Sequence, residues 1–160
     1  MSITLDGTLG ITSVTGSASL TTAGPAFSAY SNTNQSITAS TLTKVQINTK
    51  VFDTNSNYDN TTNYRFTPTV AGYYKIIGRV DGQASGAITR LFSTIFKNGA
   101  EYSRGVDAAV TLYGSIVTSL IYLNGTTDYV ELYAFINGTT PAIQNGSTLT
   151  YFQGSLIRSA

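Results

Sequence analysis

Apolar and polar residues alternate in short stretches along most of the chain. The clearest stretch is 73–80, in which Tyr74 and Ile76 fall on one face of an extended chain and the residues between them fall on the other. A period of two is typical of a β-strand with one buried face. Pro68, which lacks an amide hydrogen, and Gly72 predict a turn directly before this strand.

The same alternation predicts further strands, separated by segments rich in Asn and Gly. Their predicted ranges are 26–30, 45–53, 88–97, 101–104, 110–123, 129–136 and 149–157. Asn98-Gly99 is the strongest hairpin signal, because both residues tolerate the positive φ of a tight turn. No segment shows a sustained helical period with caps. About eight to ten antiparallel strands predict an all-β sandwich, most commonly connected as a jelly roll.

Two of the predicted strands, 110–123 and 129–136, are apolar on both faces. A strand of an antiparallel sheet that is apolar on both faces needs a cover on each of them. If the second faces were left uncovered, aromatic residues would form a large apolar patch on a monomer. A neighbouring subunit is the predicted cover, and a loop of the same chain is the alternative. The candidate interface residues are Tyr113, Tyr129, Tyr133 and Phe135.

Residues 1–24 are small, polar and almost uncharged, and have too few apolar residues for a core of their own. We expect them to form an arm that becomes ordered against sister subunits or a partner. The alternative is a flexible leader. The chain is therefore divided into an anchoring or assembly arm, 1–24, and a β-domain, 25–160. The candidate anchoring residues of the arm are Ile3, Leu5, Leu9, Ile11 and Val14.

Length and charge limit the possible partners. The 160 residues fit one domain. The net charge is +1 and the basic residues are scattered, so no footprint for nucleic acid or an anionic membrane is present. No apolar run is long enough to span a bilayer, and the N-terminus lacks the pattern of a signal peptide. The absence of cysteine excludes disulfides.

Little in the sequence indicates catalysis or a cofactor. The chain has no histidine and no nucleophile, phosphate-loop or dinucleotide motif. A hydrolase that uses two of the eight carboxylates is an alternative, although we expect most of these acids to lie scattered in loops. Asp128 is interpreted as a turn-capping residue, and a calcium site as a lesser alternative. No metal ligand and no cofactor are expected.

Several tyrosines have two possible roles. An exposed tyrosine can stack on a sugar ring, whereas a tyrosine in a strand can simply fill space, and the second role is the more common. The residues in question are Tyr30, Tyr58, Tyr64 and Tyr102.

The spacing Phe66-x5-Gly72-x-Tyr74 resembles the signature of C1q-like domains, members of the C1q and tumour necrosis factor superfamily. Phe66, Pro68, Gly72 and Tyr74 are the core and turn residues that this resemblance implies. Ile76 and Gly78 depart from it, since they stand where family members often carry aromatic residues. Further similar segments follow in order: 25–29, 51–54 with 58–59, 97–99, 123–130 and 151–156.

The resemblance implies a ten-stranded jelly roll that assembles as a homotrimer. The low charge, the absence of cysteine and the Leu-Asp-Gly-Thr leader are most similar to C1q-like modules of bacteriophage virion proteins. The expected function is therefore a non-enzymatic structural role on the virion surface, as a tail-fibre or appendage module in host attachment, for a protein made in the host cytoplasm. Its expected partners are its own copies, other virion proteins and a host-surface carbohydrate or protein. Alternatives are a capsid decoration protein that clamps capsomers and a free carbohydrate- or protein-binding trimer.

Overall fold

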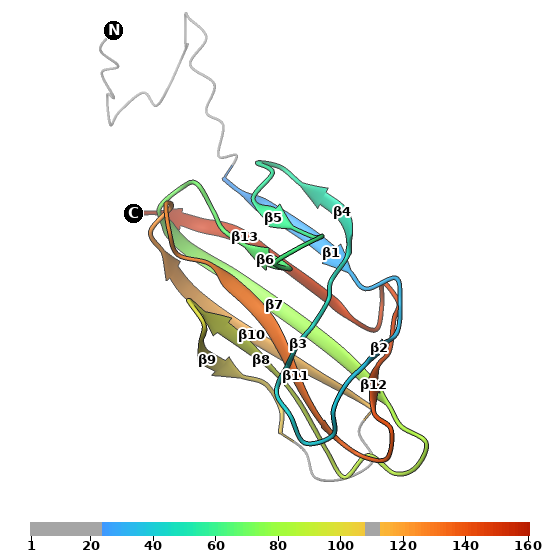
Figure 1. Cartoon of the computed structure of the whole chain (residues 1–160). Helices are drawn as coiled ribbons and strands as arrows, with labels where there is room; N and C mark the ends of the chain where they lie inside the picture. The colour runs from blue at the N-terminus through green and yellow to red at the C-terminus, as the bar shows by residue number, and fades with distance from the viewer. Residues whose placement is uncertain (1–23, 108–112) are drawn as a thin grey trace, which may run out of the picture.

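Two antiparallel β-sheets, packed face to face, make up the computed structural model of the chain (Figure 1). The structure describes residues 24–107 and 113–160. In these residues the chain forms strands and no helix. The described residues therefore contain no helix that is long and apolar enough to cross a membrane. The candidate anchoring residues Ile3, Leu5, Leu9, Ile11 and Val14 lie outside the described residues.

Each sheet has five principal strands. Sheet one contains, in order across the sheet, β4 (Thr49–Asp53), β1 (Ala26–Tyr30), β13 (Tyr151–Ser159), β7 (Gly72–Gln83) and β10 (Gly114–Leu123). Sheet two contains β5 (Tyr58–Asp59), β6 (Arg65–Phe66), β11 (Val130–Asn137), β8 (Arg90–Lys97) and β9 (Ala100–Arg104). Three further strands, each two residues long as β5 and β6 also are, extend the sheets: β2 (Gln35–Ser36) and β12 (Ala142–Ile143) in sheet one, and β3 (Thr43–Lys44) in sheet two. The ten principal strands confirm the predicted ten-stranded jelly roll.

The central strand of sheet one is β7, which pairs with β13 on one side and β10 on the other. Its inward side chains, among them Tyr74, Ile76 and Val80, are completely buried. Tyr73 and Lys75, which alternate with them, are exposed. The predicted period of two is confirmed here, because one face of this strand lies on the core.

The signature residues join the two sheets through aromatic packing. The ring of Phe66 on β6 meets that of Tyr74 on β7 edge to face, with 5.7 Å between their centroids, and stacks on Phe27 of β1 at 4.4 Å. The Tyr74 hydroxyl donates a hydrogen bond of 2.7 Å to the carbonyl oxygen of Val70, in the turn after Pro68. Burial raises the pKa of Tyr74 to about 12, which keeps this hydroxyl a donor. These contacts hold the turn against the core.

Gly78 departs from the family pattern for a steric reason. A Cβ atom at this position would lie 2.4 Å from Cδ1 of Leu132, which reaches across from β11 in sheet two. Leu132 is completely buried and occupies the space in which an aromatic side chain at position 78 would have to lie. The core is therefore filled from the opposite sheet.

The predicted strand 45–53 is wrong in its first half. The strand β4 begins at Thr49, and Val51 is 63% exposed. Val45 and Ile47 are nevertheless buried, since this segment crosses from β3 in sheet two to β4 in sheet one and passes over the end of the core. The alternation therefore marked burial correctly at Val45 and Ile47, where the chain forms no strand, and wrongly at Val51, which lies in the strand but is exposed.

The Asn98-Gly99 hairpin is confirmed. Both residues have positive φ, 53° and 81°, and Lys97 pairs with Ala100 across the two-residue loop between β8 and β9. The strand predicted at 110–123 is observed from Gly114, and residues 108–112 lie outside the described residues.

Candidate functional site

The outer face of sheet one carries large apolar side chains that the subunit itself does not cover. Tyr73 on β7 and Tyr122 on β10 are register partners, so both rings lie on this face, with 5.5 Å between their centroids. Leu120 is two residues before Tyr122 and is 61% exposed. We refer to this surface as the sheet-one face. It consists of Tyr73, Ile77, Ile116, Leu120, Tyr122 and Ile157.

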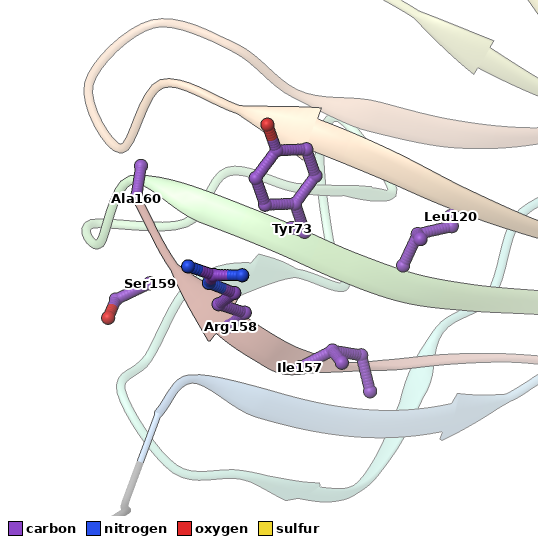
Figure 2. A pocket seen from close by; sticks show the side chains of 6 residues that line it. All are labelled: Tyr73, Leu120, Ile157, Arg158, Ser159 and Ala160. Atoms are coloured by element: carbon purple, nitrogen blue, oxygen red, sulfur yellow. The ribbon is translucent and has the colours of Figure 1, made fainter.

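A hollow of about 500 Å³ opens on the sheet-one face near the end of β13. Tyr73, Leu120 and Ile157 line it from three strands, together with 158–160 at the end of the chain (Figure 2). Ile157 is 59% exposed, since the register of β13 against β7 shifts between Leu156 and Arg158. The shift turns an additional apolar side chain outward beside the hollow.

Three cationic side chains lie on the sheet-one face: Lys75, Arg79 and Arg158, the last of which lines the hollow. The guanidinium of Arg79 is paired within the subunit, because its Nε lies 2.9 Å from Oδ1 of Asp81. Lys75 lies opposite Leu120 on the neighbouring strand and borders a smaller hollow of about 170 Å³ with Phe52. A mostly apolar face of this extent is typical of a surface that binds another protein.

Three further large apolar side chains are exposed on β9, directly after it and directly before β10. Tyr102, Val106 and Tyr113 are 50%, 57% and 66% exposed. The hydroxyl of Ser115 donates a hydrogen bond of 3.0 Å to the carbonyl oxygen of Val106. This bond joins the segment that follows β9 to the beginning of β10. We call Tyr102, Val106 and Tyr113 the tyrosine edge.

The four residues predicted as one interface do not lie together. Tyr113 precedes β10 of sheet one, whereas Tyr129, Tyr133 and Phe135 lie on or beside β11, on the outer face of sheet two. The prediction that they form one exposed patch is therefore wrong. The reason is topological: β10 and β11 follow each other in the sequence but belong to opposite sheets.

Side chains of the same subunit cover the aromatic rings on the outer face of sheet two. Phe135 stacks on Phe92 at 4.9 Å, and Tyr133 stacks on Phe96 at 4.0 Å. Cationic groups lie over the rings: Arg104 over Phe92 at 4.2 Å, Arg65 over Tyr129 at 4.4 Å, Arg90 over Phe135 at 5.2 Å and Lys44 over Tyr133 at 5.9 Å. Such cation–π contacts leave Tyr129, Tyr133 and Phe135 only half-exposed.

The residues of the sheet-one face were missed as a group by sequence reasoning. The alternation placed Ile116 and Leu120 on a common face, and it placed Tyr73 and Ile77 together on the outer face of 73–80. Their combination into one surface depends on the pairing of β7 with β10, which no local pattern reveals. Of the tyrosines considered for stacking, Tyr58 is a core residue, 3% exposed, and Tyr102 is in the tyrosine edge.

The carboxylates of the described residues are all held by partners. The prediction that most lie in loops is wrong, since Asp53, Asp59, Asp81, Glu101 and Glu131 lie in strands. Their partners are cations or backbone amides of the same subunit. Within 24–107 and 113–160 there is no group of three or more acidic side chains that could hold a metal ion.

These partners stabilise the charged forms of the acids. Backbone amides of Thr62 and Thr61 lower the pKa of Asp59, and the guanidinium of Arg104 lowers the pKa of Glu101. Arg90 lowers the pKa of Asp107, and the amide of Asn98 lowers that of Asp128. A general acid requires a raised pKa, so none of these four is suited to that role. Asp128 accepts a hydrogen bond from the Asn124 amide, as expected of a turn residue.

The fold is identified by comparison with solved structures, and not by comparison with known sequences. No protein-family model matches the chain, and no curated protein sequence matches it. The structure of murine APRIL at pH 8.0 aligns with a TM-score of 0.65 and 10% identity, over 84% of this chain and 100% of that one. The globular domain of zebrafish complement 1qA aligns with a TM-score of 0.59 and 20% identity, over 85% and 99% of the two chains.

A viral protein has the same architecture. The vertex protein P5 of phage PRD1 aligns with a TM-score of 0.57 and 16% identity, over 84% of this chain and 74% of that one. At these identities the similarity establishes the fold alone. Together with the observed strand order, it shows that the chain has the C1q/TNF-like jelly-roll fold, which is also found in a phage vertex protein.

Proposed function

We propose that this chain is a non-enzymatic structural protein of a phage virion, displayed on the particle surface as a homotrimer that acts as a fibre or appendage module in host attachment. The observation that carries the proposal is the sheet-one face, on which Tyr73, Leu120 and Ile157 are between 45% and 61% exposed. Apolar side chains of this size, placed side by side, are stabilised by burial against another subunit.

The positions of the apolar surfaces favour a ring of subunits. The sheet-one face and the tyrosine edge lie on different sides of the sandwich, one across β7 and β10 and the other along β9. When the edge of one subunit packs on the face of the next, the contact is heterologous, and such contacts form a ring when the rotation between successive subunits closes. A ring of three agrees with the trimers that the sequence resemblance implies. Tyr113 remains in the proposed interface, as a residue of the edge.

The virion role rests on the resemblance to phage virion proteins and on the occurrence of this fold in PRD1 vertex protein P5. The placement of the chain start is compatible with it. Gly24 lies beside Leu156, at the end of the sandwich where β1 begins and β13 ends (Figure 1). In a threefold ring with parallel subunits, all three arms would start at one end. Residues 1–24 are proposed to fix the trimer to the particle there.

Light scattering on the purified protein tests the assembly. The expected mass is three times the subunit mass of 17.0 kDa. A monodisperse monomer would contradict the trimer.

Immunogold labelling of intact particles tests the location. Label on a fibre or appendage is expected. Label spread over the capsid faces would instead favour capsid decoration, and absence of label would favour a free binding protein.

The arm is tested by replacing apolar residues with aspartate. The double variant Leu5→Asp/Leu9→Asp is expected to remain trimeric and to lose association with particles. Thr4→Asp/Thr8→Asp is the matched control, since it adds the same charge at neighbouring polar positions. Unchanged association of the Leu variant would show that the arm is not the anchor.

A further inference from the structure

Two cations of the sheet-one face have no side-chain carboxylate as a partner within the part of the chain that the structure describes. They are Lys75 on β7 and Arg158 on β13. Every carboxylate in 24–107 and 113–160 is held by a different cation or, in the case of Asp59, by backbone amides. The one acid outside these ranges is Asp6. It is therefore the one side-chain carboxylate that remains to be matched with Lys75 or Arg158.

The hollow at the end of β13 combines apolar walls with one of these cations. Tyr73, Leu120 and Ile157 contribute its large apolar side chains, and Arg158 lines it beside them (Figure 2). Arg158 is the register partner of Tyr73, so both side chains lie on the outer face. The volume of about 500 Å³ is within the range of ligand pockets. The hollow therefore suits a peptide segment in which apolar residues flank one carboxylate.

Residues 3–9, which lie outside the described residues, have this composition. Ile3, Leu5 and Leu9 are apolar, and Asp6 stands between them. Asp6 is also the only charged side chain in 1–24. No other part of the arm combines large apolar residues with a carboxylate, so the chemistry of the hollow selects this segment as its occupant.

The hollow lies next to the point at which the arm joins the sandwich. The amide of Leu156 donates a hydrogen bond of 3.0 Å to the carbonyl oxygen of Pro25, and a Cβ atom at Gly24 would lie 2.4 Å from Cδ2 of Leu156. Residues 157–160, which line the hollow, follow directly in the chain. Asp6 is 18 residues from Gly24, and such a length spans up to about 60 Å when extended. The segment can therefore turn back and reach the hollow of its own subunit.

We infer that residues 3–9 bind in the hollow of their own subunit. The carboxylate of Asp6 pairs with the guanidinium of Arg158, whose planar fork can hold both oxygens of a carboxylate. The apolar side chains of the segment bury the exposed parts of Tyr73 and Leu120. An ion pair between apolar walls is screened less by water and salt than one on an open surface.

The inference goes beyond the proposed function, because a contact within one subunit forms in a monomer as well as in a trimer. The hollow takes up only one end of the sheet-one face. A sister subunit that packs on the rest of this face would close over the segment and its ion pair. On a particle the segment would exchange the hollow for its anchoring site, since both use Leu5 and Leu9, and this exchange alone rests on the proposed function.

Hydrogen exchange of the full-length protein, followed by mass spectrometry of its N-terminal peptide, tests the contact. We expect the amides of 3–9 to exchange at least about tenfold more slowly in the wild type than in Arg158→Asp, because loss of the ion pair releases the segment. Asp6→Arg is expected to give the same fast exchange. The double variant Asp6→Arg/Arg158→Asp restores the pair with reversed charges and should restore the slow exchange. Equal exchange in the wild type and the single variants, or no recovery in the double variant, overturns the inference.

Arg65 provides the matched control. Within the described residues it also lacks a carboxylate partner, but it lies on β6 of sheet two, over the ring of Tyr129. Asp6→Arg/Arg65→Asp should therefore exchange as fast as Asp6→Arg alone. Equal recovery with Arg158→Asp and with Arg65→Asp would indicate an effect of net charge and would overturn the location. The melting temperature of each variant is recorded to verify that the sandwich is folded.

A disulfide tests which subunit the segment occupies. The chain has no cysteine, so the variant Thr4→Cys/Ser159→Cys can form disulfides only between the introduced residues. Ser159 lines the hollow. We expect a bond within one chain, seen without reductant as a faster-migrating monomer band. A bond between two chains, or no bond, overturns the placement in the same subunit.

The control for the disulfide is Thr4→Cys/Thr139→Cys. Thr139 is bonded to Ser85, beyond the end of β7 that is opposite to Tyr73. We expect this pair to cross-link more slowly than the pair with Ser159→Cys. Equal rates overturn the hollow as the site.

The mass of each preparation and its labelling of particles are recorded alongside. A monomer in which residues 3–9 exchange slowly overturns the trimer and supports this inference. A trimer that labels particles and shows no slow exchange in 3–9 overturns this inference alone.

Discussion

Replacing Leu120 by arginine tests the sheet-one face as the subunit interface. Leu120 is 61% exposed and lies opposite Lys75 on the neighbouring strand. In an isolated subunit the new side chain extends into water, so the fold is retained. In a trimer the guanidinium would be buried beside a charge of the same sign, where no carboxylate of its own face reaches it.

The size of the effect follows from burial and charge. Complete burial of a leucine side chain stabilises by about 1.5–3 kcal/mol. Leu120 is 61% exposed in the single subunit, so burial of this part in the trimer is expected to stabilise each subunit contact by about 1–2 kcal/mol. An unpaired buried charge costs about 3 kcal/mol or more. Since about 1.4 kcal/mol changes an equilibrium constant tenfold, each contact is expected to weaken about a thousandfold.

Light scattering at low micromolar concentration is the assay. The wild type is expected to be trimeric and Leu120→Arg monomeric, with the same β-sheet circular dichroism. Leu42→Arg is the matched control, because Leu42 is a second exposed leucine, located before β3 and away from the sheet-one face. It is expected to remain trimeric.

The opposite outcome would refute the reasoning. A Leu120→Arg trimer of unchanged stability would exclude the sheet-one face. Tyr133→Ala distinguishes the remaining possibility, since it alters only the outer face of sheet two, where Tyr133 stacks on Phe96. A monomer with Tyr133→Ala and a trimer with Leu120→Arg would place the interface on sheet two.

Further predictions concern the stability of the subunit, measured by urea unfolding. Gly125→Ala is expected to lose more than about 1 kcal/mol, because φ is +72° and the new Cβ would lie 2.4 Å from the amide of residue 71; the control Gly86→Ala, with its nearest atom at 3.8 Å, should change little. Equal effects would contradict this. Lys44→Met should cost about 3–5 kcal/mol, since it strands the carboxylate of Glu131, 3% exposed and 2.6 Å from the Lys44 ammonium, and adding Glu131→Gln should restore much of the loss. No recovery in the double variant would refute the pairing. Asp59→Ala should cost about 1 kcal/mol at neutral pH. Because the folded pKa of Asp59 is lowered, its stabilisation is present above the ordinary pKa near 4 and is lost as the pH falls further, so the difference between wild type and variant should shrink in acid. A difference independent of pH would count against it.

Local patterns were sufficient for most of the fold. The alternation at 73–80, the Asn98-Gly99 hairpin and the buried Phe66 and Tyr74 follow from side-chain period and turn chemistry, which act over a few residues. The pattern failed at 45–48, where burial alternates without a strand, because pairing depends on a neighbour that the local sequence does not contain.

The sequence by itself determined the strand-forming segments, the turns and the two-sided apolar character of the strand that contains Leu120. Only the tertiary structure decided which apolar faces remain open. It separated Tyr113 from Tyr133 by placing β10 and β11 in opposite sheets, and it covered Tyr133 with Phe96 and Lys44. It also brought Leu120 and Tyr73 to the same hollow by pairing β10 with β7. The physical reason is that a side-chain period of two gives the two faces of each strand, whereas exposure depends on pairings between residues distant in the sequence.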